Sequence, residues 1–374
     1  MLNKILGLVD LHADAELGAL TESRPLSVTT LLCRYTFIDF ILSCFTNSEI
    51  DDIGILVKDH GKNITKHISR DSIYLKNSKT GFLRMLVNEN GVINPLYNTD
   101  INNLKENDYL LYDNDSDYII VAPCHFVLDA NFQELLEKHI EKGAECSLVY
   151  NESDDASMFS GCEKVVIDAI GNAQKFNKIS SKDNGRKFNV CLDIFIFNRS
   201  FFNRLIDEAS KISEVYSIKD MVKYYTKMYS KVNCIEFKGE VMCFNSLEKY
   251  FKNQMTLLKT GVDHSFLKER ESYIYTTTHN SRPVLYGEHA DVKCSLLANG
   301  SSINGIVKNS ILARDVVVED GASVENCILF SHTIVKSGVH LKNVVANKRC
   351  VFQSVNKLEG KEDAPIYIKG GSII

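Results

Sequence analysis

Eleven cysteines and ten histidines are the side chains of this sequence that could bind metals or react as nucleophiles. No two cysteines form a CxxC pair, and they stand singly in apolar segments, as Cys44 does between Ser43 and Phe45. Zinc sites and disulfide frameworks need paired spacings. We therefore predict that the cysteines are small buried side chains of a protein kept in a reducing compartment.

The composition indicates a folded protein with two domains. Its 374 residues are 44% hydrophobic and 24% charged, and acidic and basic residues are mixed to give a net charge of −5. Because the basic residues form no cluster, we expect no nucleic-acid partner. The apolar start, residues 1–10, is too short for a signal peptide or a membrane span, so we expect a cytoplasmic protein without a membrane partner.

The first part of the chain alternates short β-branched runs with amphipathic stretches. Four runs are predicted to be buried strands: residues 53–57, 118–122, 146–150 and 194–197. Residues 131–142 are predicted to form a helix ending at Gly143, with a buried face of Phe132, Leu135, Leu136 and His139 or Ile140. This succession predicts an α/β domain with a mainly parallel sheet, whose ligands bind at the carboxyl ends of the strands.

Hydrophobic residues recur at a different period after about residue 280. Inward positions six residues apart are predicted at Ile306, Leu312, Val318 and Val324, then at Ile328 and Ile334, with another row at Val339, Val345 and Val351. Corners that need positive φ are predicted at Gly300, Gly321 and Gly338 and at Asn299, Asn304, Asn309, Asn326 and Asn343. This pattern predicts a hexapeptide β-helix, and an antiparallel sheet of period two is the alternative.

We place the α/β domain in residues 1–260, a linker in 261–280 and the β-helix in 281–374. This combination resembles the sugar-phosphate nucleotidyltransferases, and most closely bacterial glucose-1-phosphate adenylyltransferase. Residues 17–21 resemble the family's LxPLT, residues 35–40 its YRxIDF, and residues 47–56 its NSGI segment and the strand that follows. The resemblance implies a Rossmann-like nucleotidyltransferase domain of the GT-A type followed by a left-handed β-helix.

The resemblance also implies a reaction, in which ATP and glucose 1-phosphate give ADP-glucose and pyrophosphate. Such a reaction needs a glycine-rich phosphate loop, basic residues and carboxylates that hold Mg²⁺. The family's loop reads GGxGxR, with a lysine-proline pair further on. This chain has substitutions at all the corresponding positions, namely Leu11, His12, Asp14, Glu16 and Leu26. Asp14 and Glu16 would repel a polyphosphate, and side chains on the loop would prevent close backbone approach.

Both metal-binding aspartates of the family are also replaced. The alignment puts His125 at the first position and Cys243 at the second. Neither supplies the hard anionic oxygen that Mg²⁺ prefers. We therefore predict no catalytic residues, no bound metal and no cofactor in this chain.

The base-binding segment, residues 99–107, keeps little of the family pattern beyond Asn107. Lys178 lies in the segment corresponding to the sugar loop, Asp193 in the segment corresponding to the family's SMG turn, and Asp220 at a position that fits the family. These four residues are the candidates for residual ligand binding, with a sugar phosphate or nucleotide as the effector.

Strands and β-helix steps are retained while the sites of chemistry are lost, which favours a subunit kept for its surface. The family includes a D-type regulatory subunit that resembles this chain in length and in its missing glycine loop. The resemblance implies a pseudoenzyme that acts in glycogen biosynthesis and forms a hetero-oligomer, expected to be a tetramer, with the catalytic subunit.

Three alternatives stay open at this point. One is an active nucleotidyltransferase with a rearranged site that uses Asp10 or Asp129. A second is a hexapeptide acyltransferase with His289, His332 or His340 as its base. The third is a sensor that binds a sugar phosphate or nucleotide without turnover.

Overall fold

The computed structural model describes residues 3–68, 73–76, 79–229, 231–260, 273–278 and 280–374. Its contacts group the chain into two compact units, which are described separately below. Unit 1 comprises Met1–Asp14, Ile38–Cys243 and Ser272–Tyr275, and unit 2 comprises Ala15–Phe37, Phe244–Glu271 and Thr276–Ile374. The grouping is thus not linear along the chain. Of the predicted linker 261–280, residues 261–272 and 279 lie outside the described residues.

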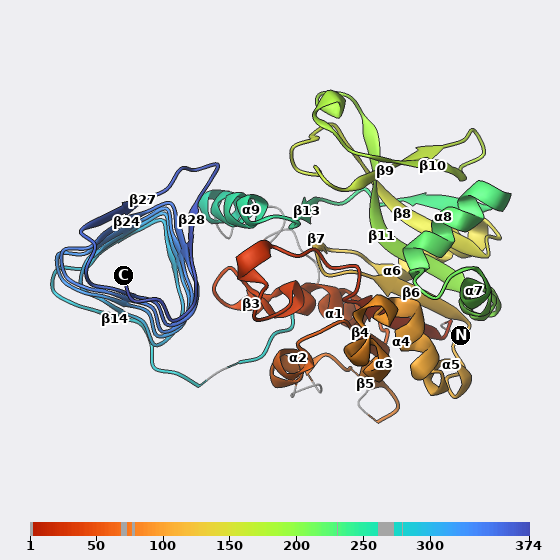
Figure 1. Ribbon diagram of the computed structural model, residues 1–374, viewed down its shortest axis with the longest axis horizontal. Helices are drawn as coiled ribbons and strands as arrows, with labels where there is room; N and C mark the ends of the chain where they lie inside the picture. Colours follow the sequence, from red (N-terminus) through yellow and green to blue (C-terminus); the bar gives the residue numbers. More distant parts are fainter. Residues whose placement is uncertain (1–2, 69–72, 77–78, 230, 261–272, 279) are drawn as a thin grey trace. The chain divides into compact units, whose positions relative to one another are not determined.

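Unit 1, in its described residues, is built on a nine-stranded, mainly parallel sheet (Figure 1). Its parallel part is β6-β1-β4-β5, made of β1 (Ile5–Asp10), β4 (Asp52–Val57), β5 (Phe82–Val87) and β6 (Tyr118–Ala122). Its other strands are β8 (Cys146–Ser153), β9 (Glu163–Ile167), β10 (Ala173–Lys178), β11 (Phe188–Asn198) and β12 (Val232–Glu236). Strand β11 runs antiparallel to β6, β8 and β9. The four predicted strands are confirmed as β4, β6, β8 and β11.

A short antiparallel pair, β7 (Phe126–Leu128) and β13 (Val241–Cys243), follows the carboxyl end of β6. The α-helices of this part of the chain are α1 (Phe37–Asn47), α2 (Gly61–Ile68), α3 (Glu89–Ile93), α4 (Asp100–Glu106), α5 (Tyr109–Tyr112), α6 (Phe132–Glu141), α7 (Arg199–Ile212) and α8 (Ile218–Tyr229).

Helix α6 shows how the local pattern produced the predicted element. Asn131 accepts hydrogen bonds from the first-turn N–H groups, and Gly143 follows the helix with φ +58°, as a helix end requires. Phe132, Leu135, Leu136 and His139 are buried as predicted, whereas Ile140 is 39% exposed and the prediction for it was wrong. The imidazole of His139 bonds Ser147 and Asn198, so its polar atoms are satisfied inside the core.

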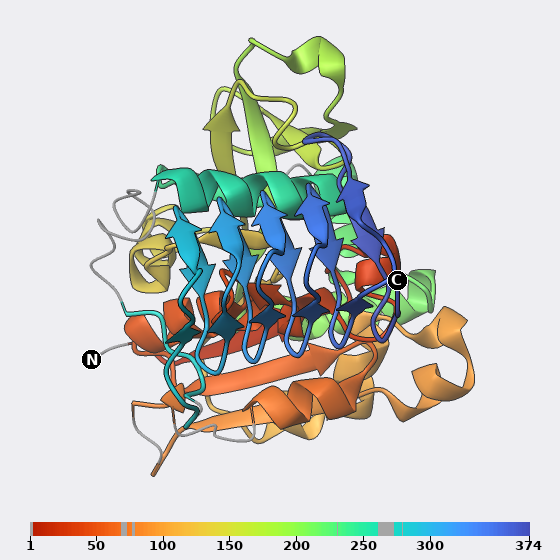
Figure 2. The same cartoon turned by 90° about the vertical axis from the view of Figure 1, so that its left-hand side faces the viewer.

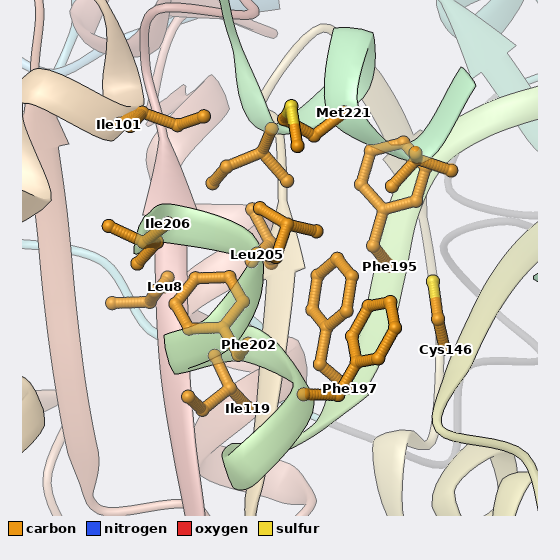
Figure 3. Packing of buried hydrophobic residues seen from close by; sticks show 14 of the residues in the cluster. Leu8, Ile101, Ile119, Cys146, Phe195, Phe197, Phe202, Leu205, Ile206 and Met221 are labelled. Carbon is orange, nitrogen blue, oxygen red and sulfur yellow. The ribbon is translucent and has the colours of Figure 1, made fainter. Parts of the chain in front are cut away.

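Alternating residues of β1 separate the two faces of the sheet. Leu8 belongs to the main hydrophobic core, where α7 packs Phe202, Leu205 and Ile206 against the sheet residues Ile119, Phe195 and Phe197 (Figure 3). Gly7 points to the other face, where the Phe45 ring of α1 lies so close that a Cβ would be 2.9 Å from it. Each face is therefore covered by helices, as expected for strands buried on both sides.

In unit 2, the chain winds into a three-sided parallel β-helix (Figures 1 and 2). The first side contains β14 (Leu285–Tyr286), β17 (Ser302–Ile303), β20 (Val317–Val318), β23 (Ile334–Val335) and β26 (Val351–Phe352). The second contains β15 (Asp291–Lys293), β18 (Ile306–Lys308), β21 (Ser323–Glu325), β24 (His340–Lys342) and β27 (Lys357–Glu359). The third contains β16 (Leu296–Leu297), β19 (Ile311–Leu312), β22 (Ile328–Leu329), β25 (Val344–Ala346) and β28 (Ile366–Ile368).

The predicted inward residues of this β-helix are only partly correct. Leu312, Val318, Val324 and Val339 belong to the buried core of the coils. Ile306, Ile328, Ile334, Val345 and Val351 do not, because their neighbours Val307, Leu329, Val335, Val344 and Phe352 take the inward positions. Val318 pairs with Val335, 17 residues later, and the inward residues between them are Val324 and Leu329. The sides are therefore six, five and six residues long, so a strict period of six loses the register.

The corners are mostly as predicted. Gly300, Gly321 and Gly338 have φ of +86°, +73° and +79°, and Asn309, Asn326 and Asn343 have φ of +46°, +51° and +51°. Asparagine tolerates this left-handed conformation better than other residues with a Cβ. Asn299 and Asn304 do not adopt it, so the prediction was wrong for those two.

Unit 2 also contains α9 (Leu247–Thr260), β2 (Thr30–Leu31) and β3 (Tyr35–Thr36). Helix α9 lies alongside the β-helix, with its axis across the direction of the coil strands (Figures 1 and 2). The rings of Tyr250 and Phe330 are 6.4 Å apart, and Gln254 Oε1 accepts a 2.8 Å hydrogen bond from the Leu32 N–H. Among the described residues, no helix is long and apolar enough to cross a bilayer.

Candidate functional site

Asp14, in the predicted phosphate loop, directs its carboxylate into the protein. Its Oδ1 accepts hydrogen bonds from the backbone N–H groups of Cys124 (2.8 Å) and His125 (3.1 Å), just beyond the carboxyl end of β6. Backbone N–H groups at this edge of a parallel sheet are donors that an anionic ligand could use. Here a side chain of the chain itself bonds them.

His125, at the first predicted metal position, lies between two carboxylates. Its Nδ1 is 3.7 Å from Asp14 Oδ1, and its Nε2 is 4.0 Å from Asp193 Oδ2. Asp193 has φ +55°, the left-handed conformation that glycine adopts most easily. This residue stands where the resemblance puts the glycine of an SMG turn, so the backbone shape is retained while a carboxylate is added.

Two lysines of α8 continue this row of charges. Lys219 Nζ is 2.7 Å from Asp193 Oδ1 and 3.1 Å from Glu163 Oε2, and Lys223 Nζ is 2.7 Å from the same glutamate oxygen. Asp14, His125, Asp193, Lys219, Glu163 and Lys223 thus form one connected set, which we call the ionic chain. Sequence reasoning found its first three members and missed the last three. The only signal for these was the four-residue spacing of the two lysines, which puts both on one helix face.

The ionic chain sets the charge states of its members. Burial acts to raise the pKa of Asp193, but Lys219 and His125 outweigh it and hold the pKa of this carboxyl below its usual range. Burial likewise acts to lower the pKa of Lys219, and the nearby Asp193 raises it above its ordinary value instead. Both groups are therefore charged at neutral pH, which makes them a buried ion pair rather than a polar contact.

Next to the ionic chain, Asp10 and Asp100 form a buried carboxyl pair. Burial first, and then repulsion from Asp100, raise the pKa of Asp10 well above its usual value, and burial raises the pKa of Asp100 to about 6. Asp100 accepts hydrogen bonds from the Ile218 N–H at the start of α8, and Asp10 accepts one from the His12 N–H. Both carboxyl groups are thus engaged in holding the fold.

Replacing Asp10 with asparagine is expected to make the protein more stable at pH 8 by about 2 kcal/mol. A carboxyl group whose pKa is raised in the folded state stabilises the fold below its unfolded pKa, near 4, and this contribution is lost as pH rises through the folded pKa. The amide of the Asp10→Asn variant would still accept from His12 and would donate to Asp100. Urea unfolding between pH 4 and pH 8 measures this, and an advantage that does not grow with pH would contradict it. Asp59→Asn, at a half-exposed carboxylate, is the control.

The other phosphate-loop positions carry no positive charge toward this edge of the sheet. Leu11 is buried and its N–H bonds Leu56 O, while burial lowers the pKa of His12 to about 4, so its imidazole is neutral at pH 7. In unit 2, Glu16 is exposed and Leu26 is buried in a short 3-10 helix, Leu26–Val28. None of these positions offers the basic side chain that a polyphosphate needs.

The predicted base-binding segment holds strands together. Asn107 ends α4 and donates to Val87 O and Asn103 O, and Asn103 donates to Val57 O, Leu86 O and the ring of His12. These amides are therefore bonded to the chain itself.

The four candidates for residual ligand binding are not brought together. Lys178 is exposed at the end of the edge strand β10. Asp220 accepts from Ser217 N–H and Oγ, which caps the start of α8. Asp193 belongs to the ionic chain and Asn107 to α4. A shared role in binding one ligand stays a prediction.

Cys243, at the second predicted metal position, is fully buried on β13 and its Sγ is 3.4 Å from that of Cys162. All eleven cysteines lie in the described residues, and none is in a disulfide. Eight are buried, as predicted, whereas Cys33 and Cys234 are partly exposed and Cys294 is exposed.

Two comparisons identify the family. Residues 16–260 match the family model described as "Nucleotidyl transferase", and residues 284–363 match one described as "GlmU-like, C-terminal hexapeptide". The chain belongs to the nucleotidyl transferase family. The resemblance seen in the short motifs, and the fold it implied, are thereby confirmed.

The curated relatives of this nucleotidyl transferase family member cover nearly its whole length. A glucose-1-phosphate adenylyltransferase of Desulfitobacterium hafniense (strain DSM 10664 / DCB-2) is 24% identical over 368 residues, which are 96% of this chain and 90% of that protein. The glycogen biosynthesis protein GlgD of Bacillus subtilis (strain 168) is 24% identical over 376 residues, 99% of this chain and 97% of that protein. A glucose-1-phosphate adenylyltransferase of Fervidobacterium nodosum is 23% identical over 364 residues, 94% of this chain and 86% of that protein. The similarity thus runs to proteins of glycogen biosynthesis.

The Mg²⁺ that this nucleotidyl transferase fold implies does not fit the donors of this chain. Imidazole and thiol stand at the two ligand positions, and magnesium favours carboxylate oxygens. Asp193 is paired with Lys219, and Asp14 Oδ1 bonds two backbone N–H groups, which leaves Asp14 Oδ2 as a single buried oxygen without a hydrogen-bond partner in the described chain. The described residues contain no group of three side chains placed to hold a metal ion.

The alternative bases and ligands are similarly engaged. Asp10, proposed for a rearranged metal site, is buried in the carboxyl pair, and Asp129 lies just after β7, apart from any such group of three in the described residues. On the β-helix, His289 pairs with Asp320, His332 with Asp315 and His340 with Ser323. These three histidines have different partners on different coils and are exposed, so they form no common pocket.

Proposed function

We propose that this chain is a non-catalytic regulatory subunit of glucose-1-phosphate adenylyltransferase in glycogen biosynthesis. The observation that carries the proposal is the ionic chain, in which Asp14 takes the backbone N–H groups and Lys219 takes the carboxylate of Asp193. The positions where a triphosphate and a divalent cation would need donors are thus bonded internally.

The electrostatics of the edge of the sheet support the same proposal. Asp14 carries negative charge in the loop, and His12 is neutral at pH 7, so a polyphosphate would meet repulsion without a compensating cation there. Electrostatic stabilisation is the main contribution of enzymes to phosphoryl-type transfer. A chain with this arrangement is expected to lack the reaction.

The chain would act on its partner through its surface. A regulatory subunit changes a catalytic one when their contacts differ in free energy between two states of the catalytic subunit, and 1–3 kcal/mol corresponds to a roughly five- to hundredfold effect. We propose a hetero-oligomer with the catalytic glucose-1-phosphate adenylyltransferase of the same organism, expected to be a tetramer.

The purified chain with ATP, Mg²⁺ and glucose 1-phosphate is expected to form ADP-glucose at least about 10³-fold more slowly than the catalytic subunit. Added to that subunit, it should co-elute in size-exclusion chromatography and change kcat/KM at least about fivefold in either direction. Pyrophosphate release measures both rates, and the catalytic subunit with an equal mass of serum albumin is the control.

Two results would contradict the proposal. Steady ADP-glucose formation by the chain alone, abolished by Asp193→Asn, would favour the active enzyme with a rearranged site. Unchanged kinetics of the catalytic subunit together with separate elution would remove the regulatory role. Calorimetry with glucose 1-phosphate and ADP-glucose then tests whether an effector binds.

A further inference from the structure

Two thiols meet inside unit 1, although their residues are far apart in the sequence. Cys162 Sγ and Cys243 Sγ are 3.4 Å apart, across a separation of 81 residues. Cys162 is 9% exposed and Cys243 is fully buried. A disulfide requires sulfur atoms about 2 Å apart. Rotation of the two side chains is expected to close most of the remaining gap.

The pair joins the two ends of the region that contains the ionic chain. Cys162 directly precedes Glu163, which bonds both lysines of α8. Cys243 pairs in register with Phe126, the residue after His125. A bond between the sulfurs would therefore link the strand that starts with Glu163 to the strand pair next to His125.

We propose that Cys162 and Cys243 form a reversible disulfide, with a low-molecular-weight disulfide such as oxidised glutathione as the oxidant. The thiolate of Cys162, the more exposed of the two, attacks one sulfur of the reagent and releases one glutathione thiolate. The thiolate of Cys243 then attacks Sγ of Cys162 and releases the second. Two electrons pass to the reagent, and the two thiol protons leave with the glutathione products.

The bond would hold this region closed. It encloses a long loop of chain, which raises stability mainly by restricting the unfolded state. The midpoint of thermal unfolding is therefore expected to rise by about 3–8 °C on oxidation. The chain alone is sufficient for this measurement, so its outcome is independent of whether the chain regulates an enzyme.

The experiment treats the full chain with oxidised glutathione at pH 8, blocks remaining thiols with iodoacetamide, and maps peptides by mass spectrometry without reduction. A linked peptide containing Cys162 and Cys243 is expected, together with glutathione on the exposed Cys294 as the sign that the reagent acts. Cys162→Ser and Cys243→Ser should each lower the yield of the link at least tenfold. Cys44→Ser, at a buried thiol of α1, is the matched control and should leave the yield unchanged.

Mapping of the unmodified sequence decides the matter even where a variant fails to fold. If Cys294 is modified while Cys162 and Cys243 are recovered as alkylated or separately glutathionylated peptides, the proposal is overturned. A linked peptide that appears only in urea, or without a shift of the unfolding midpoint, would also overturn it. A link that reverses with dithiothreitol and raises the midpoint supports it.

Discussion

Lys219→Met is expected to lower the free energy of unfolding by about 3 kcal/mol at pH 7. The lysine side chain is 26% exposed and the Asp193 side chain 10%, so removal of the cation leaves a carboxylate that water reaches poorly. Glu163 would lose one of its two lysines in the same change. Urea unfolding followed by circular dichroism measures the loss.

The pH dependence separates this explanation from a loss of packing. Because the pKa of Asp193 is lowered in the folded state, the stability from this ion pair is present above the unfolded pKa, near 4, and is lost as pH falls through the folded pKa. The deficit of Lys219→Met should thus be largest at neutral pH and shrink below pH 4.

Lys223→Met is the matched control, since Lys223 bonds Glu163 alone and should cost no more than about 1 kcal/mol. The double variant Lys219→Met with Asp193→Asn should recover most of the loss because no unpaired charge remains. Equal effects of Lys219→Met and Lys223→Met would mean that the ionic chain is not a buried network.

Asn343→Leu is expected to lower the free energy of unfolding of the β-helix by about 3 kcal/mol. Asn343 has φ +51° and is buried, and its Nδ2 donates a 2.8 Å hydrogen bond to Gly360 O on the next coil. Its Oδ1 accepts from Asn326 of the preceding coil. Leucine would strain the left-handed backbone and leave Asn326 Nδ2 and Gly360 O without this partner. Urea unfolding followed by circular dichroism measures the loss.

Two controls divide this effect into its causes. Asn343→Gly keeps the backbone conformation and loses only the hydrogen bonds, so about half of the loss is expected. Asn299→Ala changes an exposed asparagine that is not in the left-handed conformation and should cost less than about 0.5 kcal/mol. A loss below about 1 kcal/mol for Asn343→Leu would show that the asparagine ladder contributes little.

Local patterns predicted the elements well where one period applied along the chain. Strand β4 and helix α6 were found because burial alternates or repeats at the spacing of the element itself. The lumen of the β-helix was found only in part. Its sides of six, five and six residues carry Val318, Val324 and Leu329 inward, and a constant spacing of six selected Ile328 instead.

The loss of the family's chemical groups was readable from residue types, since His125 and Cys243 lack carboxylate oxygens wherever they point. What replaced them was not readable. Lys219 and Glu163 are 56 positions apart and each is an ordinary surface residue in its own segment; only the packing of α8 on the sheet brings them to Asp193.

The sequence by itself determined the two kinds of fold and the absence of a magnesium-binding pair of aspartates, because periodicity and side-chain chemistry are local properties. The tertiary structure alone decided that Asp14 bonds the backbone beyond β6, that an ion pair lies beside His125, and that Cys162 meets Cys243. These contacts join residues far apart in the chain, and the path of the backbone through space, which no local spacing records, sets their distances.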